Sequence, residues 1–342
     1  MAIDSATPSV CRPRILRCVS VGAVALSAVL AGPAAAALLA YDPFAYGADP
    51  SAGEYVLGDE SAGTGVIGGQ NPVIGPTLFY TGPWIQSGGD AQVVKALPSL
   101  SYPGLQAGVG GVQEETLQFN CCTFGRSGRE IDGGLGGGRS PRTIYESFVI
   151  DFGSQGTDDP TAFGLRGHEL WNGGVGDSFR AVQVYMNHFS GTNVLTLAIN
   201  TASGSFSVPI GGGGLNLATL AGTNDGMHLV VMKYEFAADA PDVVSLYFDP
   251  ALGIEPALPD AQIATATSDL FITHQGAFSN FTFSGPGHVP GGIDEIRWGD
   301  TYADVTPIAT PVPEPATMML FATGLLALHL GAKRRRGASG AG

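Results

Sequence analysis

Charged residues are scarce in this chain of 342 residues, and basic residues are the scarcest. Only 13% of the residues are charged, with 16 basic against 30 acidic side chains. Seven of the basic residues lie near the two ends, so the body between Leu38 and Val312 holds 9 basic and 28 acidic residues, a net charge of −19. A surface this acidic repels phosphate backbones, which excludes DNA and RNA as partners.

Cysteine is nearly absent from the body. Cys11 and Cys18 lie in the N-terminal segment, which leaves only the adjacent pair Cys121 and Cys122. Two neighbouring cysteines cannot connect distant parts of a fold. In an oxidising compartment three states stay open for this pair: a strained vicinal disulfide, pairing between chains, or two free thiols.

Several motifs of common enzymes and metal sites are also missing. The six histidines show no His-x-x-x-His or comparable spacing, so a structural zinc site is not expected. No Gly-x-Ser-x-Gly nucleophile elbow occurs. The glycine run at 211–214 lacks the Gly-Lys-Ser/Thr of a phosphate-binding loop and is expected to be an ordinary loop.

Glycine, in contrast, is abundant. The 51 glycines are about twice the usual share and argue against a long helical protein, while 44% hydrophobic residues suffice for a core. Between the two ends, short β-rich runs alternate with Gly, Pro, Asn and Asp, and no run shows helix caps with a 3.6-residue period. The sequence therefore predicts an all-β domain of two packed antiparallel sheets over residues 38–308.

The turn residues also predict which strands pair. The clearest strands are expected at 147–152, 181–187, 194–200, 205–210, 228–236, 243–248 and 270–273. Two short connections predict hairpins, one between 194–200 and 205–210 and one between 228–236 and 243–248.

The first 37 residues show the pattern of a secretory signal peptide. Three arginines at 12–17 precede a small and apolar run at 19–30, and further small residues follow at 32–37. Cleavage is expected after Ala37, with Ala40 as the alternative. The twelve residues of the apolar run are too few to cross a hydrocarbon core of about 30 Å, which argues against an uncleaved anchor.

The C-terminal segment, 309–342, combines three parts. They are the tripeptide Pro313, Glu314 and Pro315, an apolar run at 316–332, and a basic cluster of Lys333, Arg334, Arg335 and Arg336. The apolar run is long enough for a helix of about 25 Å, at the short end for a transmembrane helix. Because basic clusters prefer the cytoplasmic side, the body is expected outside the membrane.

These three parts, in this order, resemble the PEP-CTERM sorting signal of exported proteins in Gram-negative bacteria that make extracellular polysaccharide. The resemblance implies transient anchoring in the inner membrane, then recognition and cleavage of the tail by an exosortase, a membrane cysteine protease. The implied destination is the cell surface or the extracellular matrix. A plain C-terminal anchor is the alternative, and neither interpretation says what the body does.

Four segments of the body carry a second resemblance. They lie at 41–46, 100–105, 243–250 and 292–299, the last of which is followed by a fifth matching stretch at 302–307. These segments resemble exported bacterial concanavalin-like or laminin-G-like modules. The resemblance implies a jelly-roll β-sandwich whose first and last strands pair, so residues 294–298 are expected beside Phe44.

Glu130, Ile131 and Asp132 give the strongest enzyme signal. Laminarinase-type glycoside hydrolases, which share the jelly-roll fold, carry Glu-x-Asp-x-x-Glu or a variant one residue shorter on one strand. Alternate strand residues face one side, so such a strand aligns a nucleophile, an assisting Asp and an acid in one cleft. Here 133–136 (Gly-Gly-Leu-Gly) replaces the third carboxylate and predicts a loop. No catalytic residue is therefore expected, and the protein is not expected to be an enzyme.

Calcium is the cofactor that the second resemblance suggests, because laminin-G-like modules often hold Ca²⁺ at a sheet rim with carboxylate and carbonyl oxygens. The candidate positions are two acidic turns, one with Asp158 and Asp159 and one with Asp239 and Asp242. No Asp-x-Asp-x-Asp-Gly loop occurs, and acidic turns are ordinary in an acidic protein, so no definite site is predicted.

Aromatic side chains are candidates for glycan contact because sugar rings stack on them. Trp84 lies among Gly and Pro residues, where a loop would expose it, and Trp171 is the second candidate.

Together these patterns predict an exported surface or matrix protein whose sandwich binds or embeds in extracellular polysaccharide. Two alternatives stay open: a glycoside hydrolase or lyase on the same fold, and a structural module that binds protein. A second carboxylate in the cleft would favour the hydrolase, and an exposed aromatic platform would favour glycan binding. The binding prediction rests on fold analogy.

Overall fold

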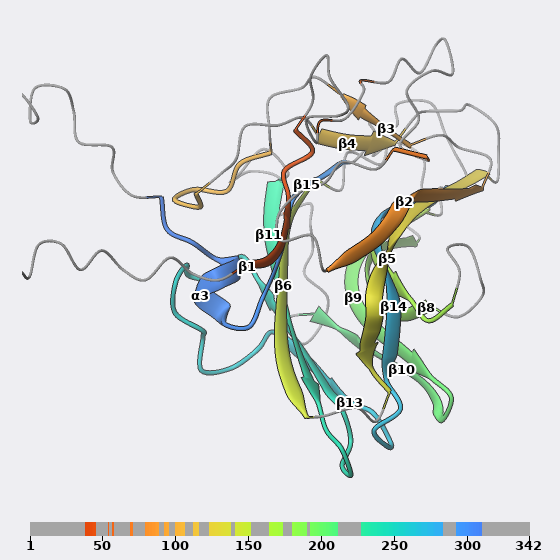
Figure 1. Cartoon of the computed structure of the whole chain (residues 1–342), viewed down its shortest axis with the longest axis vertical. Helices are drawn as coiled ribbons and strands as arrows, with labels where there is room; N and C mark the ends of the chain where they lie inside the picture. Colours follow the sequence, from red (N-terminus) through yellow and green to blue (C-terminus); the bar gives the residue numbers. More distant parts are fainter. Residues whose placement is uncertain are drawn as a thin grey trace, which may run out of the picture. The chain divides into compact units, whose positions relative to one another are not determined.

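Two antiparallel β-sheets pack face to face in this protein (Figure 1). The computed structural model describes residues 38–45, 54, 57, 69–70, 79–88, 92–95, 100–106, 112–115, 123–137, 141–151, 164–173, 180–189, 192–210, 227–282 and 292–309. All of them belong to one unit of the chain, Ala37–Gly342. The predicted all-β sandwich of two antiparallel sheets is confirmed.

One sheet has eight strands in the order β13, β12, β11, β6, β15, β4 and β3, with β1 also paired to β15. Their bounds are β1 (Leu38–Asp42), β3 (Gln92–Lys95), β4 (Val112–Glu115), β6 (Arg142–Asp151), β11 (Met227–Phe236), β12 (Val243–Phe248), β13 (Ala261–Ala264) and β15 (Gly292–Gly299). The strands β4 and β1 follow one another along the same edge of β15, because β4 pairs with its start and β1 with its end.

The other sheet has seven strands in the order β10, β9, β8, β7, β14, β5 and β2. Their bounds are β2 (Tyr80–Gly88), β5 (Thr123–Gly136), β7 (Gly164–Trp171), β8 (Arg180–Phe189), β9 (Thr192–Thr201), β10 (Gly204–Pro209) and β14 (Phe271–Thr282). No helix within the described ranges is long and apolar enough to cross a membrane. The expected signal peptide and the expected membrane helix at 316–332 lie outside the described residues.

The pairings expected from the sequence are present. The first and last strands pair, with Tyr41 of β1 opposite Arg297 of β15. Both predicted hairpins form, β9 with β10 and β11 with β12. Pairing of the first strand with the last is what the resemblance to jelly rolls implied.

The glycine-rich stretch after Asp132 is the clearest error of the sequence-based prediction. Residues 133–136 form the end of β5 and not a loop. Gly133, Gly134 and Gly136 have φ values of 64°, 68° and 77°, which are costly for other residues. Gly136 also lies so close to Leu270 that an added Cβ would be 2.1 Å from its carbonyl oxygen. The glycines are what let this strand bend and pack closely.

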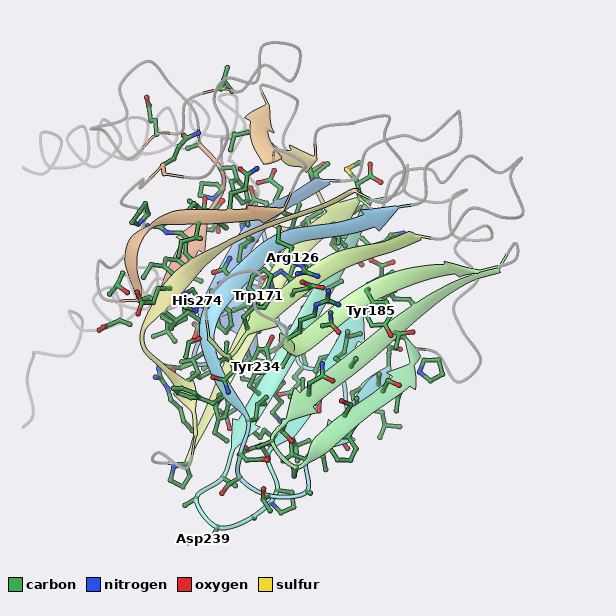
Figure 2. All side chains as sticks on the ribbon, turned by 90° about the vertical axis from the view of Figure 1, so that its right-hand side faces the viewer. Arg126, Trp171, Tyr185, Tyr234, Asp239 and His274 are labelled. Carbon is green, nitrogen blue, oxygen red and sulfur yellow. The ribbon has the colours of Figure 1, made fainter. Side chains whose placement is uncertain are left out.

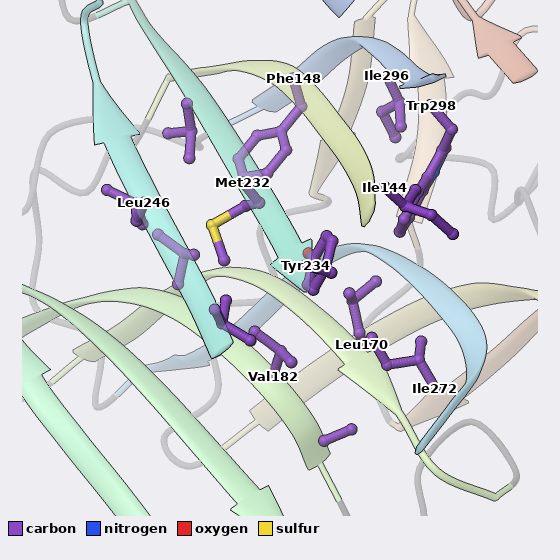
Figure 3. Close-up of a cluster of buried hydrophobic side chains, with 14 of the residues drawn as sticks. Ile144, Phe148, Leu170, Val182, Met232, Tyr234, Leu246, Ile272, Ile296 and Trp298 are labelled. Carbon is purple, nitrogen blue, oxygen red and sulfur yellow. The ribbon is translucent and has the colours of Figure 1, made fainter. Parts of the chain in front are cut away.

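The main core lies between the two sheets and is built from alternate residues of facing strands. Ile144 and Phe148 of β6 and Met232 of β11 point toward the side chains of Leu170 on β7 and Ile272 on β14 (Figure 3). All five side chains are fully buried. The residues between them in each strand point to the outer faces of the sandwich.

A buried polar network crosses this core. Nε2 of His168 on β7 lies 2.8 Å from Oε1 of Glu146 on β6, and the hydroxyl of Tyr234 on β11 donates to Oε2 of Glu146 at 2.6 Å. Burial and the adjacent Glu146 carboxylate raise the pKa of Tyr234 well above its usual value. Because buried polar groups must keep their partners, the network favours one position of the sheets relative to each other.

The outer face of the eight-stranded sheet is closed by the chain itself. A second apolar cluster forms there from Leu105, Tyr145, Val149, Leu229, Val231, Tyr247, Tyr302 and Val305. The covering parts are the segment 100–106, the loop 249–260 and the short helix α3 (Tyr302–Val305), which begins with a capping box of Thr301 and Asp304. The hydroxyls of Tyr145 and Tyr247 donate to Glu255 of the covering loop at 2.8 and 2.6 Å.

Candidate ligand-binding face

The outer face of the seven-stranded sheet carries a cluster of polar and aromatic side chains. The alternation of each strand puts them there: Leu170 of β7 and Val182 and Val184 of β8 belong to the core, so Glu169 and Gln183 point outward. Figure 2 looks onto this face, with Arg126 and Trp171 near its middle and His274 and Tyr185 to either side. We call this surface the polar face.

Glu169 is the centre of the polar face. Its Oε1 accepts a hydrogen bond from Nε2 of Gln183 at 2.7 Å and lies 3.4 Å from Nε of Arg180. Its Oε2 lies 3.3 Å from Nε of Arg126. Arg126 comes from β5 and reaches over the intervening strand β14, so three strands that are not neighbours in sequence meet at one carboxylate. The four side chains hold each other in fixed orientations.

Trp171 lies beside this cluster on the same face. Its six-membered ring covers Gly276 of β14, where an added Cβ would be 2.4 Å from Cζ3 of Trp171 and 1.8 Å from the carbonyl oxygen of Glu169. The ring is fully buried, and no acceptor among the described residues takes the hydrogen bond of its indole N–H. A buried donor of this kind suits an acceptor that a ligand brings.

The margins of the polar face are more accessible. Tyr185 on β8 is half-buried, and burial raises its pKa, partly offset by a hydrogen bond with Thr196. Glu130 on β5 is exposed and lies opposite His274 of β14 in the strand register. Ser205 and Ser207 of the edge strand β10 are exposed.

The two tryptophans expected to contact glycan differ in position. Trp84 of β2 is in the core, where its ring packs against Phe44 with centroids 6.0 Å apart, and the guanidinium of Arg129 lies 6.0 Å from the ring. Trp171 is on the polar face but buried, as described above. Neither ring therefore presents an open platform to solvent in this structure.

The acidic residues expected as calcium ligands do not form a cluster where they are described. Asp158 and Asp159 lie outside the described residues. Asp239 is exposed at the tip of the loop between β11 and β12 (Figure 2). Asp242 is buried, and its two carboxylate oxygens accept from the backbone N–H groups of Ala237 and Leu270 at 2.8 and 2.9 Å.

Burial raises the pKa of Asp242, although the two backbone hydrogen bonds act against that shift. The contacts show a structural role, joining the loop after β11 to the start of β14. Across the described part of the chain, no three His, Cys, Asp or Glu residues come together in a way that could hold a metal ion.

The possible hydrolase motif is on a strand after all. Glu130 and Asp132 are both exposed on β5, and the backbone N–H of Asp132 donates to the carbonyl of Phe79. A second outward-facing carboxylate does exist, that of Glu169, but β14 lies between β5 and β7. Two strand spacings separate the backbones by about 10 Å, against a separation of about 5 Å between the carboxyl groups of a retaining pair.

The central residues of the polar face were missed by sequence reasoning. Gln183 and Tyr185 carried a readable signal, because they alternate with Val182 and Val184 in a predicted strand. Glu169 carried none, since β7 has charged or polar residues on both of its faces.

Comparisons with known proteins bear on the C-terminal segment first. Residues 311–336 match the family model of the PEP-CTERM protein-sorting motif. The predicted sorting signal, including Pro313, Glu314 and Pro315 and the basic cluster, is thereby confirmed as a motif. The motif implies an exported protein that an exosortase processes. A comparison with curated proteins finds no match.

Solved structures of similar fold are lectin-like and lyase β-sandwiches. An endo-β-1,4-glucuronan lyase from the fungus Trichoderma reesei is 15% identical, with a TM-score of 0.37, over 65% of this chain and 90% of that chain. The globular domain of T. cruzi calreticulin is 11% identical, with a TM-score of 0.37, over 65% and 86% of the two chains. Arcelin-5, a lectin-like defence protein from Phaseolus vulgaris, is 10% identical, with a TM-score of 0.37, over 64% and 92%.

Proposed function

We propose that this protein is exported to the cell surface or extracellular matrix and binds extracellular polysaccharide through the polar face. In the proposed organisation, a signal peptide spans residues 1–37, the sandwich spans 38–308 and the sorting signal spans 309–342. The apolar run at 316–332 is the transient membrane anchor that is lost on exosortase cleavage.

One observation carries the binding proposal: the two outer faces of the sandwich differ. The chain covers the outer face of the eight-stranded sheet with an apolar cluster of its own. On the seven-stranded sheet, the corresponding position is occupied by Arg126, Glu169 and Gln183, side chains that form hydrogen bonds in defined directions. Fixed polar groups on a sheet face are the means by which a protein orients a polar ligand.

The chemistry of this face suits a sugar. Sugar hydroxyls both donate and accept hydrogen bonds, as Glu169 and Gln183 require of a partner. Trp171 and Tyr185 add rings that pack against the apolar C–H surfaces of a pyranose.

Binding of the full-length chain to a panel of bacterial exopolysaccharides tests the proposal, with Ca²⁺ and with chelator, while released sugar is measured. We expect binding without release. Gln183→Leu should weaken binding about fivefold, because it removes one neutral hydrogen-bonding group. Gln262→Leu, the same change at an exposed position of β13 in the other sheet, is the matched control and should leave affinity unchanged.

Three outcomes would change this assignment. Release of reducing sugar would make the protein a hydrolase, and release of unsaturated sugar would make it a lyase. The absence of binding to every polysaccharide would refute the proposal and favour a module that binds protein. Loss of binding on chelation would add a cation to the site.

A further inference from the structure

The charge of this acidic body is unevenly divided between its two sheets. Strands of the eight-stranded sheet contain 4 basic and 8 acidic residues. Strands of the seven-stranded sheet contain 4 basic residues, Arg126, Arg129, Arg166 and Arg180, and only 3 acidic ones. The seven-stranded sheet thus has a net charge of +1 within a body of −19. Almost half of the body's basic residues are on the sheet that carries the polar face.

Two of these arginines are held in place by one carboxylate. The Nε atoms of Arg126 and Arg180 both lie within 3.4 Å of Glu169, so the three side chains carry a net charge of +1. Arg180 is at the margin of the face, and 29% of its side chain is exposed. A guanidinium oriented through Nε can direct its terminal nitrogens toward a carboxylate or sulfate, which is the geometry that arginine recognises best.

Trp171 adds a donor that carries no charge. Its indole N–H is buried and finds no acceptor among the described residues. A buried donor without a partner is costly, and an acceptor from a ligand would remove that cost. Arg180 and Trp171 are thus both donors, and an anionic group is a ligand that only accepts.

We infer that the polysaccharide bound at the polar face is anionic, with carboxylate or sulfate groups that pair with Arg180 and Arg126. This inference rests on the proposed function and specifies its substrate class. The rest of the body is acidic and repels a polyanion at long range, so the arginines supply selectivity at short range. Salt screens both the local attraction and the general repulsion, so a salt titration alone does not isolate the arginine contact.

The test compares matched polymers and matched variants of the full-length chain. The polymers are alginate and its carboxyl-reduced form, and dextran sulfate and dextran, so that each pair differs only in the anionic group. Arg180→Gln should weaken binding of the anionic polymers about tenfold, as expected for a lost charge-assisted hydrogen bond. Arg180→Lys, which keeps the charge, should stay within about threefold of wild type.

Arg142→Gln is the matched control for loss of one positive charge. Arg142 lies on β6 of the other sheet, 47% of its side chain is exposed, and it pairs with Asp300 at 2.9 Å. This variant should bind as wild type does. Thermal unfolding of each variant shows whether an affinity change reflects loss of the fold.

The outcomes separate this inference from the proposed function. Preference for alginate over its reduced form assigns the carboxylate, and preference for dextran sulfate over dextran assigns the sulfate. Equal affinity for charged and neutral polymers, or equal losses in R180Q and R142Q, would overturn the anionic assignment while polysaccharide binding stands. No binding to these polymers or to the exopolysaccharide panel would overturn both.

Discussion

The indole ring of Trp171 lies across Gly276 on the neighbouring strand, where no other residue would fit. A Cβ at Gly276 would be 2.4 Å from Cζ3 of Trp171 and 1.8 Å from the carbonyl oxygen of Glu169. The second distance involves backbone, which cannot move aside as a side chain can. The glycine therefore keeps Trp171 flat on the polar face and keeps β7 close to β14 beside Glu169.

Gly276→Ala is expected to destabilise the protein by about 3 kcal/mol, because the added methyl overlaps both the ring and the backbone of β7. Urea denaturation followed by tryptophan fluorescence measures the loss. Ser207→Ala, an exposed position on β10 of the same sheet, should change stability by less than about 0.5 kcal/mol. A loss at Gly276 as small as that at Ser207 would show that β7 and β14 are not packed as described.

The buried network predicts a difference between two tyrosines that both donate to a glutamate. Tyr234→Phe removes the 2.6 Å hydrogen bond to Glu146, a carboxylate that is fully buried between the sheets. Leaving a buried carboxylate with one partner fewer should cost about 2 kcal/mol. Equilibrium unfolding of the variant gives the value.

Tyr145→Phe is the matched comparison. Tyr145 donates to Glu255 at 2.8 Å, but 30% of the Glu255 side chain is exposed, so water can replace the lost donor. The expected loss is at most about 1 kcal/mol. If the two variants lose equal stability, burial is not what makes the inter-sheet network important.

Glu255 also predicts a dependence of stability on pH. Burial opposes its ionisation, but hydrogen bonds from Tyr247, Tyr145 and Lys233 outweigh burial and lower the pKa of Glu255 below its usual value of 4.5. A carboxyl group whose pKa falls on folding adds stability above its unfolded-state pKa and loses it as the pH falls through the folded value. Glu255→Gln should therefore be less stable than wild type at pH 7, and the difference should shrink on acidification below pH 4.5.

Unfolding free energies between pH 7 and pH 3 test this dependence. Glu235→Gln serves as the control because Glu235 also lies near Lys233, at 3.4 Å, without the two tyrosine donors. A difference between wild type and Glu255→Gln that stays constant or widens at low pH would contradict the assignment of these hydrogen bonds.

The parts of the fold that were predictable have local signals. The hairpin of β11 and β12 could be read because two runs of β-branched and aromatic residues flank a short turn. The strand β5 could not, because the glycine run at its end is typical of a loop and only contacts with Leu270 and Phe236, far along the chain, explain it. Packing against distant residues decided the structure there.

The polar face was hidden from the sequence for a related reason. Arg126, Glu169 and Gln183 lie on β5, β7 and β8, and β5 reaches β7 only across β14, which comes about a hundred residues later in the chain. No local spacing encodes such a meeting. The sorting motif is the opposite case, since all of its parts lie in one short segment that the sequence alone identified.

Two glycines with nearly equal φ angles separate the cost of the backbone angle from the cost of close packing. Gly136 has φ of +77°, and an added Cβ would be 2.1 Å from the carbonyl oxygen of Leu270. Gly82 on β2 has φ of +78° with nothing within 4 Å of the added atom. Alanine at Gly82 should therefore cost about 1–2 kcal/mol, the price of the left-handed conformation alone.

Alanine at Gly136 should cost at least about 3 kcal/mol more, because the methyl overlaps backbone that holds β5 against β14. Urea denaturation of both variants gives the two values, and their difference isolates the overlap. Similar losses in the two variants would mean that β5 does not approach Leu270, and the strand would then revert to the loop that its composition suggests. A much larger loss at Gly136 would establish that the glycine run exists to let β5 close the sheet.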